Sequence, residues 1–430
     1  MLKIHAISLG CPKNRVDTEH ALGSLGPVRM VDHLGRADLI FINTCGFILP
    51  AVEESVRTVL EAITRRNGLK RRPVLAVAGC LVGRYGATDL ARDLPEVDVW
   101  LDNRALEDWP ALLARALRRE RAAPGRFLST GPSYAWLKIG DGCRHACAFC
   151  TIPAIRGVQR SHPPVALERE ARGLLDQGVR ELVLVAQDLT DWGRDLEKRK
   201  GLTDLLERLL RLEGLVWLRL LYLYPAGITP HFLDFMKEAS AEQKLLPYFD
   251  IPLQHAHPEI LATMGRPFAR DPHRVVDAVR AALPDAALRT SLITGFPGET
   301  ERHFTALRAF VREARFDHLG VFSYRAEEGT LAADMPGQMP EAVKEERRAE
   351  LMRLQAEISA EKLEALAGKR MRVLVDAAHA EWPGLHTGRI WLQAPEIDGI
   401  TYVSGPGVRP GALVEADIVE TREYDLSALA

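Results

Sequence analysis

The sequence predicts an α/β protein built from an N-terminal parallel α/β domain, a central open (β/α)6 barrel and a small C-terminal antiparallel β-barrel. Three observations support this fold class. Short, nearly continuous apolar runs alternate with helical runs through most of the chain, a pattern typical of parallel strands that are buried on both faces. A long helical segment follows, and short apolar runs between glycine and proline turns close the chain. We expect domains at residues 1–125, 130–335 and 369–430, with a connecting helix over 340–368.

The length and composition exclude several classes of protein. At 430 residues the chain can hold two or three domains, and its formal net charge of −2 provides no overall attraction to nucleic acid or acidic membranes. No apolar run approaches the roughly 18 residues that a membrane-spanning helix needs, and the N-terminal run is too short and too polar for a signal peptide. Six cysteines in such a chain indicate metal binding or catalysis in the reducing cytoplasm rather than disulfides. We therefore expect a cytoplasmic protein.

Each of three apolar runs in the first domain ends directly before a cysteine. These are Ile4–Gly10 before Cys11, Leu39–Thr44 before Cys45, and Val74–Gly79 before Cys80, with helical segments such as Asp17–Leu25 and Ala51–Arg65 between them. The cysteines are 34 and 35 residues apart, about one β-α repeat each. Because the carboxyl ends of parallel strands meet at one edge of a sheet, we expect the three thiols to converge on a metal cluster. The alternative is three unrelated cysteines that are packed in the core.

A second group of cysteines follows an apolar, strand-like run at the start of the central domain. Cys143, Cys147 and Cys150 lie within eight residues, with the spacing C-x3-C-x2-C. Three thiolates on one loop can bind three irons of a 4Fe-4S cluster, and the fourth iron would then be open for chemistry. The alternatives are half of a zinc site, for which only His145 is nearby, and cysteines buried for packing. We interpret His255 and His257 as surface or packing histidines.

Five further apolar runs alternate with helical ones in the central domain. They are Glu181–Ala186, Val216–Tyr222, Tyr248–Pro252, Arg289–Thr294 and His318–Ser323, with helices such as Leu167–Gln177 and Thr229–Ala239 between them. Together with the strand at Trp136 they make six β-α units, which predicts the open barrel. Sites in such folds lie at the carboxyl ends of the strands, where Gln187, Gln254 and a turn at Gly295 are found.

The spacing of the second cysteine group, with Phe149 just before the last cysteine, strongly resembles the motif of the radical S-adenosylmethionine superfamily. The resemblance implies a 4Fe-4S cluster whose open iron binds S-adenosylmethionine, and an injected electron that cleaves this cofactor to a deoxyadenosyl radical. The turn after the fifth strand is similar to the superfamily's G-x-I-x-G-x-x-E element, which contacts adenine and ribose, with Ser291 in place of the first glycine. Besides the cysteines, the resulting candidates for cofactor binding are Phe149, Gln187, Gln254, Ile293, Gly295 and Arg266.

Across its whole length the chain looks like the methylthiotransferases. The stretch Gly10-Cys11-Pro12-Lys13-Asn14 resembles the branch that acts on a ribosomal protein, whereas the tRNA-modifying branch more often has GCQMN there. The resemblance implies two 4Fe-4S clusters, one on Cys143, Cys147 and Cys150 and an auxiliary one on Cys11, Cys45 and Cys80. It also implies methylthio transfer to the β-carbon of an aspartate in the twelfth protein of the small ribosomal subunit, with a reducing electron donor such as flavodoxin or ferredoxin. The rival hypotheses are a tRNA adenosine methylthiotransferase and a non-enzymatic iron–sulfur carrier.

The last hundred residues begin with a segment that Pro340 opens and Gly368 closes, as expected for a helix. Short strands are expected at Met371–Asp376, Gly388–Gln393, Gly399–Val403 and Ala412–Glu420. By its position this part is similar to the TRAM domain, which binds tRNA in related enzymes. Its six cations and nine carboxylates sum to −3, however, whereas nucleic-acid affinity depends on cations that neutralise phosphates. We therefore expect a basic ribosomal protein of the small subunit as the partner, rather than tRNA or a membrane.

Overall fold

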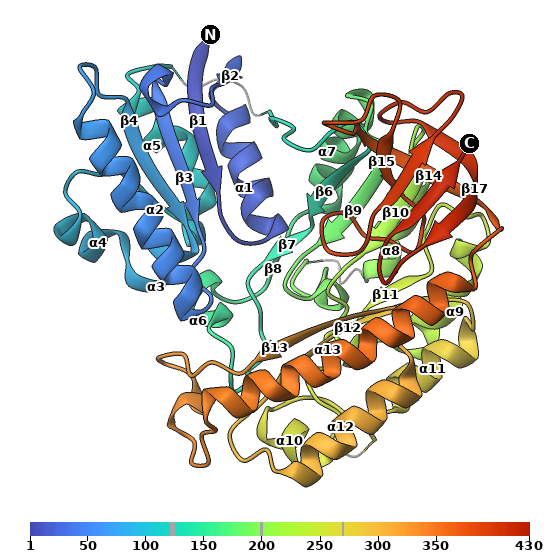
Figure 1. The fold of residues 1–430 in the computed structure, drawn as a ribbon. Coiled ribbons are helices and arrows are strands. Elements are labelled where there is room, and N and C mark those ends of the chain that lie inside the picture. Colours follow the sequence, from blue (N-terminus) through green and yellow to red (C-terminus); the bar gives the residue numbers. More distant parts are fainter. Residues whose placement is uncertain (121–124, 198–200, 269–270) are drawn as a thin grey trace.

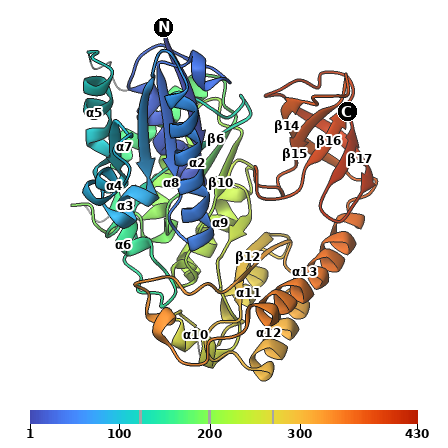
Figure 2. The ribbon, with the colours of Figure 1, turned by 60° about the vertical axis from the view of Figure 1, so that its left-hand side comes forward.

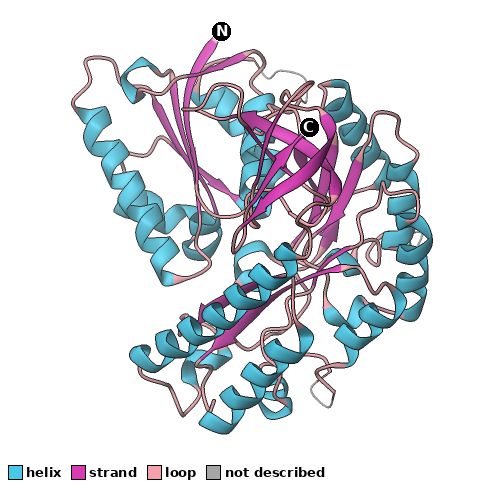
Figure 3. Ribbon diagram, turned by 45° about the vertical axis from the view of Figure 1, so that its right-hand side comes forward, coloured by secondary structure: helices cyan, strands magenta, loops and turns pink. Residues whose placement is uncertain are grey.

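Figure 1 shows the computed structural model, which describes residues 1–120, 125–197, 201–268 and 271–430. An N-terminal sheet with its helices (blue) lies beside a central set of strands (green to yellow), and a small barrel (red) ends the chain. Figure 3 shows that helices line the outer side of the central strands. The α/β architecture predicted above is confirmed. Within the described part of the chain, no helix combines the length and the apolar character needed to cross a membrane.

The N-terminal domain is a parallel sheet of five strands, β1 (Leu2–Ser8), β2 (Val28–Met30), β3 (Leu39–Thr44), β4 (Val74–Gly79) and β5 (Val99–Asp102), in the order β2-β1-β3-β4-β5. Its helices are α1 (Pro12–Gly23), α2 (Leu49–Asn67), α3 (Cys80–Tyr85), α4 (Ala87–Asp93) and α5 (Trp109–Ala116). Every residue of β3 is buried, and separate hydrophobic clusters pack on the two faces of the sheet. Ser8 pairs with Asn43 and Asn43 with Ala78, so the carboxyl ends of β1, β3 and β4 lie level.

Two helices of this domain begin earlier than the sequence pattern predicted. Helix α1 begins at Pro12 rather than at Asp17, and α2 begins at Leu49 rather than at Ala51. Each has a proline in its first two positions, where the missing N–H would have had no helical partner. The turns between strands and helices are therefore short, and Cys11 directly caps α1.

The central domain contains all six predicted strands: β6 (Tyr134–Lys138), β9 (Glu181–Val185), β10 (Trp217–Leu220), β11 (Tyr248–Asp250), β12 (Ala287–Thr294) and β13 (His318–Ser323). They form two parallel sheets, β6-β9-β10 and β11-β12-β13, rather than one continuous sheet, and an isolated parallel bridge from Leu218 to Leu245 lies between them. Residue Tyr222 has φ 62°, outside the extended region, so β10 ends before it. A short hairpin, β7 (Gly140–Asp141) with β8 (Arg160–Ser161), follows β6.

The helices of the central domain are α6 (Ile152–Arg156), α7 (Pro164–Asp176), α8 (Leu202–Leu210), α9 (Pro230–Ser240), α10 (Pro258–Thr263), α11 (Arg274–Ala282) and α12 (Glu301–Ala314). The largest hydrophobic cluster fills the space between the strands and helices α7, α8, α9, α11 and α12. Helix α6, which follows the cysteine loop, lies against α3 of the N-terminal domain (Figure 1). The end of the cysteine loop is therefore in contact with the first domain.

The connecting helix, α13 (Glu341–Glu364), packs along β13 and α12, and Figure 2 shows the C-terminal barrel beyond its end. The barrel is closed by five strands, β14 (Arg370–Ala378), β15 (His386–Arg389), β16 (Thr401–Ser404), β17 (Leu413–Thr421) and β18 (Leu426–Leu429), in the order β14-β15-β16-β18-β17. The sequence pattern predicted only four of them. The fifth, β18, pairs antiparallel with β17 and parallel with β16, and it is needed to close the barrel.

A buried ion-pair network attaches the C-terminal barrel to the central strands. The side chain of Arg389 on β15 is 3% exposed and binds Glu181 at 2.5 Å, at the start of β9, and Asp376 at 2.8 Å. Glu181 also accepts a hydrogen bond from Arg219 at 2.6 Å, and both of these side chains are fully buried. Charged side chains of this barrel therefore form buried ion pairs and do not all lie on its surface.

Two further carboxylates of the barrel bind cations of other domains. Asp398 lies 3.4 Å from Arg289 of β12, and Glu396 forms an ion pair with Arg15 of α1. Without the side chains used in these contacts, Asp376, Arg389, Glu396 and Asp398, the barrel has five cations and six carboxylates. Its remaining charge is therefore close to neutral, and the expected acidic surface is weaker than the sequence count indicated.

Candidate active site

The loop after β7 brings Cys143, Cys147 and Cys150 together. The amide of Cys143 donates to the carbonyl of Gly157 (3.0 Å), and the amide of Cys150 donates to the carbonyl of Cys147 (3.1 Å). Gly142 has φ 75°, and a Cβ there would lie 2.3 Å from the carbonyl oxygen of Val158, so only glycine fits this turn. The three half-exposed thiols are therefore presented by a loop whose shape is set by its backbone.

Burial and mutual repulsion act on these thiols. Burial, with a smaller contribution from the neighbouring Cys147, raises the pKa of Cys143 to about 11. Burial raises the pKa of Cys150 to about 12, with Cys147 and Cys143 also contributing. As thiolates, the three groups would repel one another. A metal cation that all three bind replaces their protons and removes this repulsion.

An aromatic and a cationic side chain lie beside this loop. Nε2 of His145 donates a hydrogen bond to the carboxylate of Asp188 (2.7 Å). The His145 ring stacks on that of Tyr224, with ring centroids 3.6 Å apart. Arg266 places its guanidinium 4.6 Å from the centroid of the same ring, and its Nη1 lies 3.5 Å from the sulfur of Cys147. His145 is thus occupied by Asp188, whereas Arg266, predicted as a cofactor contact, lies directly at the cysteine loop.

The other predicted contacts lie in two places. The backbone carbonyl of Gln254, a residue at φ 76°, accepts a hydrogen bond from the amide of Ile293 (2.7 Å). The side chains of Ile293 and Phe149 pack against the same hydrophobic cluster. Gln187 follows β9 and donates to Asp141 (3.1 Å), and its own carbonyl oxygen is buried without a partner among the described residues. The candidates therefore surround the carboxyl ends of the central strands.

Gly295 has a structural explanation of its own. It has φ 72°, and a Cβ there would lie 2.3 Å from Cγ of Lys344, on the connecting helix α13. Its amide donates to Glu299 (3.0 Å). The close approach of the connecting helix therefore requires a glycine at this position.

Cys11, Cys45 and Cys80 also converge. A Cβ on Gly10 would lie 3.0 Å from Cβ and 3.2 Å from the sulfur of Cys45, so the ends of β1 and β3 are in close contact. The side-chain amide of Asn14 donates to a backbone carbonyl at the end of each of these two strands (2.9 Å each). The thiol of Cys80 lies 3.6 Å from the side-chain oxygen, Oδ1, of the same residue. One asparagine thus ties all three strand ends together.

The pKa shifts of this second group also indicate that its thiols lie close together. Burial, with smaller contributions from Cys80 and Cys11, raises the pKa of Cys45 to about 11. Burial also raises the pKa of Cys80. Burial acts on Cys11 in the same direction, but the positive charges of Lys13 and Arg156 outweigh it, so the pKa of Cys11 is lowered. Each cysteine group offers three thiols in one small region, a donor set that fits a 4Fe-4S cluster with one open iron.

The two groups are joined by a buried charged network that the sequence pattern did not predict. Arg156 of α6 binds Asp141 (2.8 Å) on its own domain and donates to Asn14 (2.5 Å) on the other. Lys138 of β6 binds Asp141 (2.8 Å) and forms an ion pair with Asp17 of α1. The basic groups hold the pKa of Asp141 well below its usual range, against the effect of burial. The one sequence signal was Lys138, a charged residue in the otherwise apolar run of β6.

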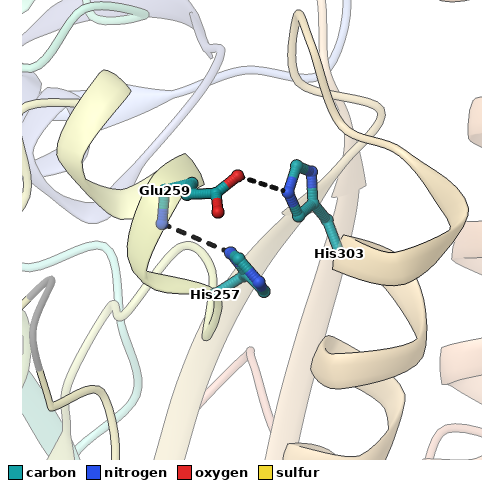
Figure 4. Close-up of side chains that lie close together, drawn as sticks. All are labelled: His257, Glu259 and His303. Carbon is teal, nitrogen blue, oxygen red and sulfur yellow. Dashed lines mark hydrogen bonds and ion pairs between the residues drawn. The ribbon is translucent and has the colours of Figure 1, made fainter.

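Figure 4 shows a third group of possible ligands, His257, Glu259 and His303. Among the described residues it is the one set of His, Cys, Asp and Glu side chains whose ligand atoms all lie within 4.8 Å of one another. Nδ1 of His257 accepts a hydrogen bond from the amide of Glu259 (3.3 Å), and Nδ1 of His303 accepts one from the amide of Thr300 (3.1 Å). Each ring therefore carries its proton on Nε2, which cannot bind a metal in that form. We interpret this group as caps of α10 and α12.

Comparisons with known proteins agree with this geometry. Three family models match the chain: the Radical SAM superfamily over residues 137–311, Uncharacterized protein family UPF0004 over 3–102, and the TRAM domain over 367–430. A relative from Nitratidesulfovibrio vulgaris strain Hildenborough, named ribosomal protein uS12 methylthiotransferase RimO, is 69% identical and aligns over 100% of both chains. A protein of the same name from Oleidesulfovibrio alaskensis is 61% identical over 100% of both chains. The chain belongs to the RimO family.

Members of this family are radical S-adenosylmethionine methylthiotransferases, and the resemblance found in the sequence is confirmed. Membership in the superfamily implies a 4Fe-4S cluster and S-adenosylmethionine. The fold is also that of the radical S-adenosylmethionine methyltransferase TsrM from Kitasatospora setae, which is 14% identical, with a TM-score of 0.55 over 90% of this chain and 77% of that one. The RimO-family chain thus combines this fold with a C-terminal TRAM domain.

Proposed function

We propose that the chain inserts a methylthio group at the β-carbon of an aspartate of ribosomal protein uS12, in the cytoplasm, with electrons from a donor such as flavodoxin or ferredoxin. Its full-length identity of 69% with a relative named for uS12 supports the substrate. We assign the 4Fe-4S cluster that binds S-adenosylmethionine to Cys143, Cys147 and Cys150, and an auxiliary 4Fe-4S cluster to Cys11, Cys45 and Cys80. The further cofactor contacts that we propose are Phe149, Gln187, Gln254, Ile293, Gly295 and Arg266.

One observation carries the proposal. Arg156 is six residues after Cys150 in the sequence, yet its Nη2 lies 3.5 Å from the sulfur of Cys80. A short, buried connection therefore links one cysteine group to the other. Sulfur insertion needs this arrangement, because a reactive carbon centre must meet its sulfur donor before water or a solvent thiol reaches it.

When bound, S-adenosylmethionine and the two clusters supply the electron, the hydrogen-abstracting radical, the methyl group and the sulfur that such an insertion consumes. The chain's own part is to hold the two sites at a fixed separation and to exclude water. Arg156 and Lys138 are buried and bind both Asp141 of their own domain and Asp17 of the first domain, so separating the domains would break the two ion pairs with Asp17. This rigidity keeps the substrate between the two sites during reaction.

The proposal is tested with anaerobically reconstituted enzyme, S-adenosylmethionine and a reductant, incubated with either uS12 or tRNA. We expect mass spectrometry to find an added methylthio group on one aspartate of uS12 and none on tRNA. Because the charge of the C-terminal barrel is close to neutral, both substrates belong in the experiment. A modified adenosine and unmodified uS12 would contradict the proposal. The absence of deoxyadenosine under all conditions would instead favour an iron–sulfur carrier. Replacing the reductant by reduced flavodoxin or ferredoxin tests the electron donor.

A further inference from the structure

Lys13 reaches from the first domain into the mouth of the central barrel. It is the second residue of α1, two positions after Cys11. Its Nζ lies 3.4 Å from the carbonyl oxygen of Ala186, at the carboxyl end of β9, and 3.7 Å from the centroid of the Tyr222 ring, just after β10. The residue is only 8% exposed. Its ammonium group therefore lies between the auxiliary cysteines and the strand ends where sites of this fold are found.

Among the residues that the structure describes, the charge of Lys13 has no carboxylate partner. Within the part of the chain that the structure describes, no carboxylate oxygen lies within 4.0 Å of its Nζ. Lys138, the other buried lysine of this region, binds both Asp17 and Asp141. A buried ammonium group without a counter-ion is unfavourable, and one weak contact with a carbonyl and one aromatic face satisfy it only in part.

Asp250, one of the acidic groups on which this charge acts, is already engaged. Lys13 contributes to lowering the pKa of Asp250, although burial, the larger effect, raises it. Asp250 accepts a hydrogen bond from the amide of Tyr222 (3.0 Å) and faces Arg289 (3.8 Å). Asp250 is therefore held by its own neighbours, and Lys13 is free to pair with an anion that enters from outside.

We propose that Lys13 binds the side-chain carboxylate of the substrate aspartate and thereby selects an acidic residue for modification. This inference rests on the proposed function and names the group that recognises its substrate. The carboxylate carbon of an aspartate is bonded directly to the β-carbon, so an ion pair at Lys13 places the reacting carbon next to the Cys11 group.

A second explanation assigns a different role to the same charge. Lys13 could balance the negative charge of a cluster on Cys11, Cys45 and Cys80, in which case it would stabilise that cluster without reading the substrate. The two roles differ in what a substitution changes. If Lys13 binds the substrate, its substitution changes how strongly the enzyme prefers a substrate with a carboxylate. If Lys13 balances the charge of the cluster, its substitution changes the cluster content.

The experiment compares the wild-type holoenzyme with K13M, K13Q and K13R on two peptides. One peptide carries the uS12 segment with its target aspartate, and the other has asparagine in its place. K3M, on an exposed lysine of β1, is the matched control. The readouts are kcat/KM for methylthio transfer, peptide affinity, iron and acid-labile sulfide per chain, and the deoxyadenosine formed without peptide.

We expect wild type and K3M to prefer the aspartate peptide by at least about tenfold, as for a site built to bind a group that the analogue lacks. K13M and K13Q should lose this preference and at least about tenfold of their activity on the aspartate peptide, while K13R keeps part of the preference. Iron, sulfide and peptide-free deoxyadenosine should not change. Retained preference in K13M, or loss of iron from K13M and K13Q, would overturn the inference. If the wild-type enzyme leaves both peptides unmodified, the proposed function itself fails.

Discussion

Nη2 of Arg156 lies 3.5 Å from the sulfur of Cys80, although the two residues are 76 positions apart and belong to different domains. The side chain of Arg156 is 1% exposed, and it also binds Asp141 and Asp17. The carboxylates raise the pKa of Arg156 well above its usual value, against the effect of burial, so it is always charged. A permanent positive charge thus stands between the two cysteine groups.

The first prediction concerns this arginine. R156M leaves Asp17 and Asp141 with Lys138 as their remaining cation, so we expect the free energy of unfolding of the metal-free protein to fall by about 3–5 kcal/mol. R156K should lose less, because it keeps the charge but not the planar set of donors that binds Asn14 and Asp141 together. Chemical denaturation measures both. R160M, at an exposed arginine four residues away, is the control and should change stability by no more than about 0.5 kcal/mol. An R156M variant as stable as R160M would contradict the buried network.

The second prediction separates the roles of the two cysteine groups. C143A should lose about four of about eight irons per chain, and it should form neither deoxyadenosine nor methylthiolated product. C80A should lose a similar amount of iron but continue to form deoxyadenosine, because the loop with Cys143 is intact. Iron analysis and chromatography of the reaction products measure these quantities. Equal loss of deoxyadenosine in the two variants would argue against two clusters with separate roles.

The third prediction concerns a buried ion pair between the first domain and the segment after β13. Arg84 of α3 binds Glu327 at 2.9 Å, with side chains 11% and 3% exposed, and the amide of Leu49 donates to the same carboxylate (2.7 Å). We expect E327Q to lower the free energy of unfolding by about 3–5 kcal/mol, because Arg84 then remains buried without a counter-ion. E328Q, at the exposed neighbouring residue, is the matched control. Hydrogen exchange at the Leu49 amide should accelerate in E327Q only.

The fourth prediction is a dependence of stability on pH. His255 is buried, and its Nε2 lies 3.2 Å from Glu299; burial lowers the pKa of this histidine below its usual value of 6.5, although Glu299 acts in the opposite direction. The unfolded chain therefore binds a proton near pH 6.5 that the folded chain does not bind. The contribution to stability is complete above pH 6.5 and is lost as the pH falls below it, by up to about 1.4 kcal/mol per pH unit.

Unfolding free energies at pH 7.5 and 5.5 check this prediction. Wild type should lose more stability between these two values than H255Q, whose amide can keep the hydrogen bond to Glu299 but does not titrate. The comparison uses the difference between the two pH values within each variant, so an overall destabilisation of H255Q does not affect it. Equal losses in the two proteins would show that His255 titrates alike in the folded and unfolded chains.

Local sequence patterns predicted most of the strands because each has a clear physical signature. The run His318–Ser323 was predicted with the bounds that β13 has, since apolar residues there are flanked by a charged turn and a polar loop. Strand β18 was missed because Leu426–Leu429 is only four residues long and lies at the end of the chain, where no second turn marks it. The division of the central strands into two sheets was also not predicted, because it depends on which strands pair and not on the local pattern of each strand.

The candidate site divides in the same way. The spacing of Cys143, Cys147 and Cys150 and the strand-end positions of Cys11, Cys45 and Cys80 could be predicted, because neighbours along the chain and the common direction of parallel strands determine them. The side chains around them could not be predicted. The packing of Gly295 against Lys344, on a helix about fifty residues later in the chain, is one example, because periodicity does not describe such a contact.

Local pattern and spacing were thus enough to predict the fold class, the family and the cysteines of the two groups. Which charges are buried against those groups depends on how the domains pack together. Lys138 and Arg156 pair with a carboxylate of the other domain, whereas Lys13 has no carboxylate partner among the described residues. The physical reason is that the cost of burying a charge depends on every group that packs around it, and those groups come together only when the domains meet.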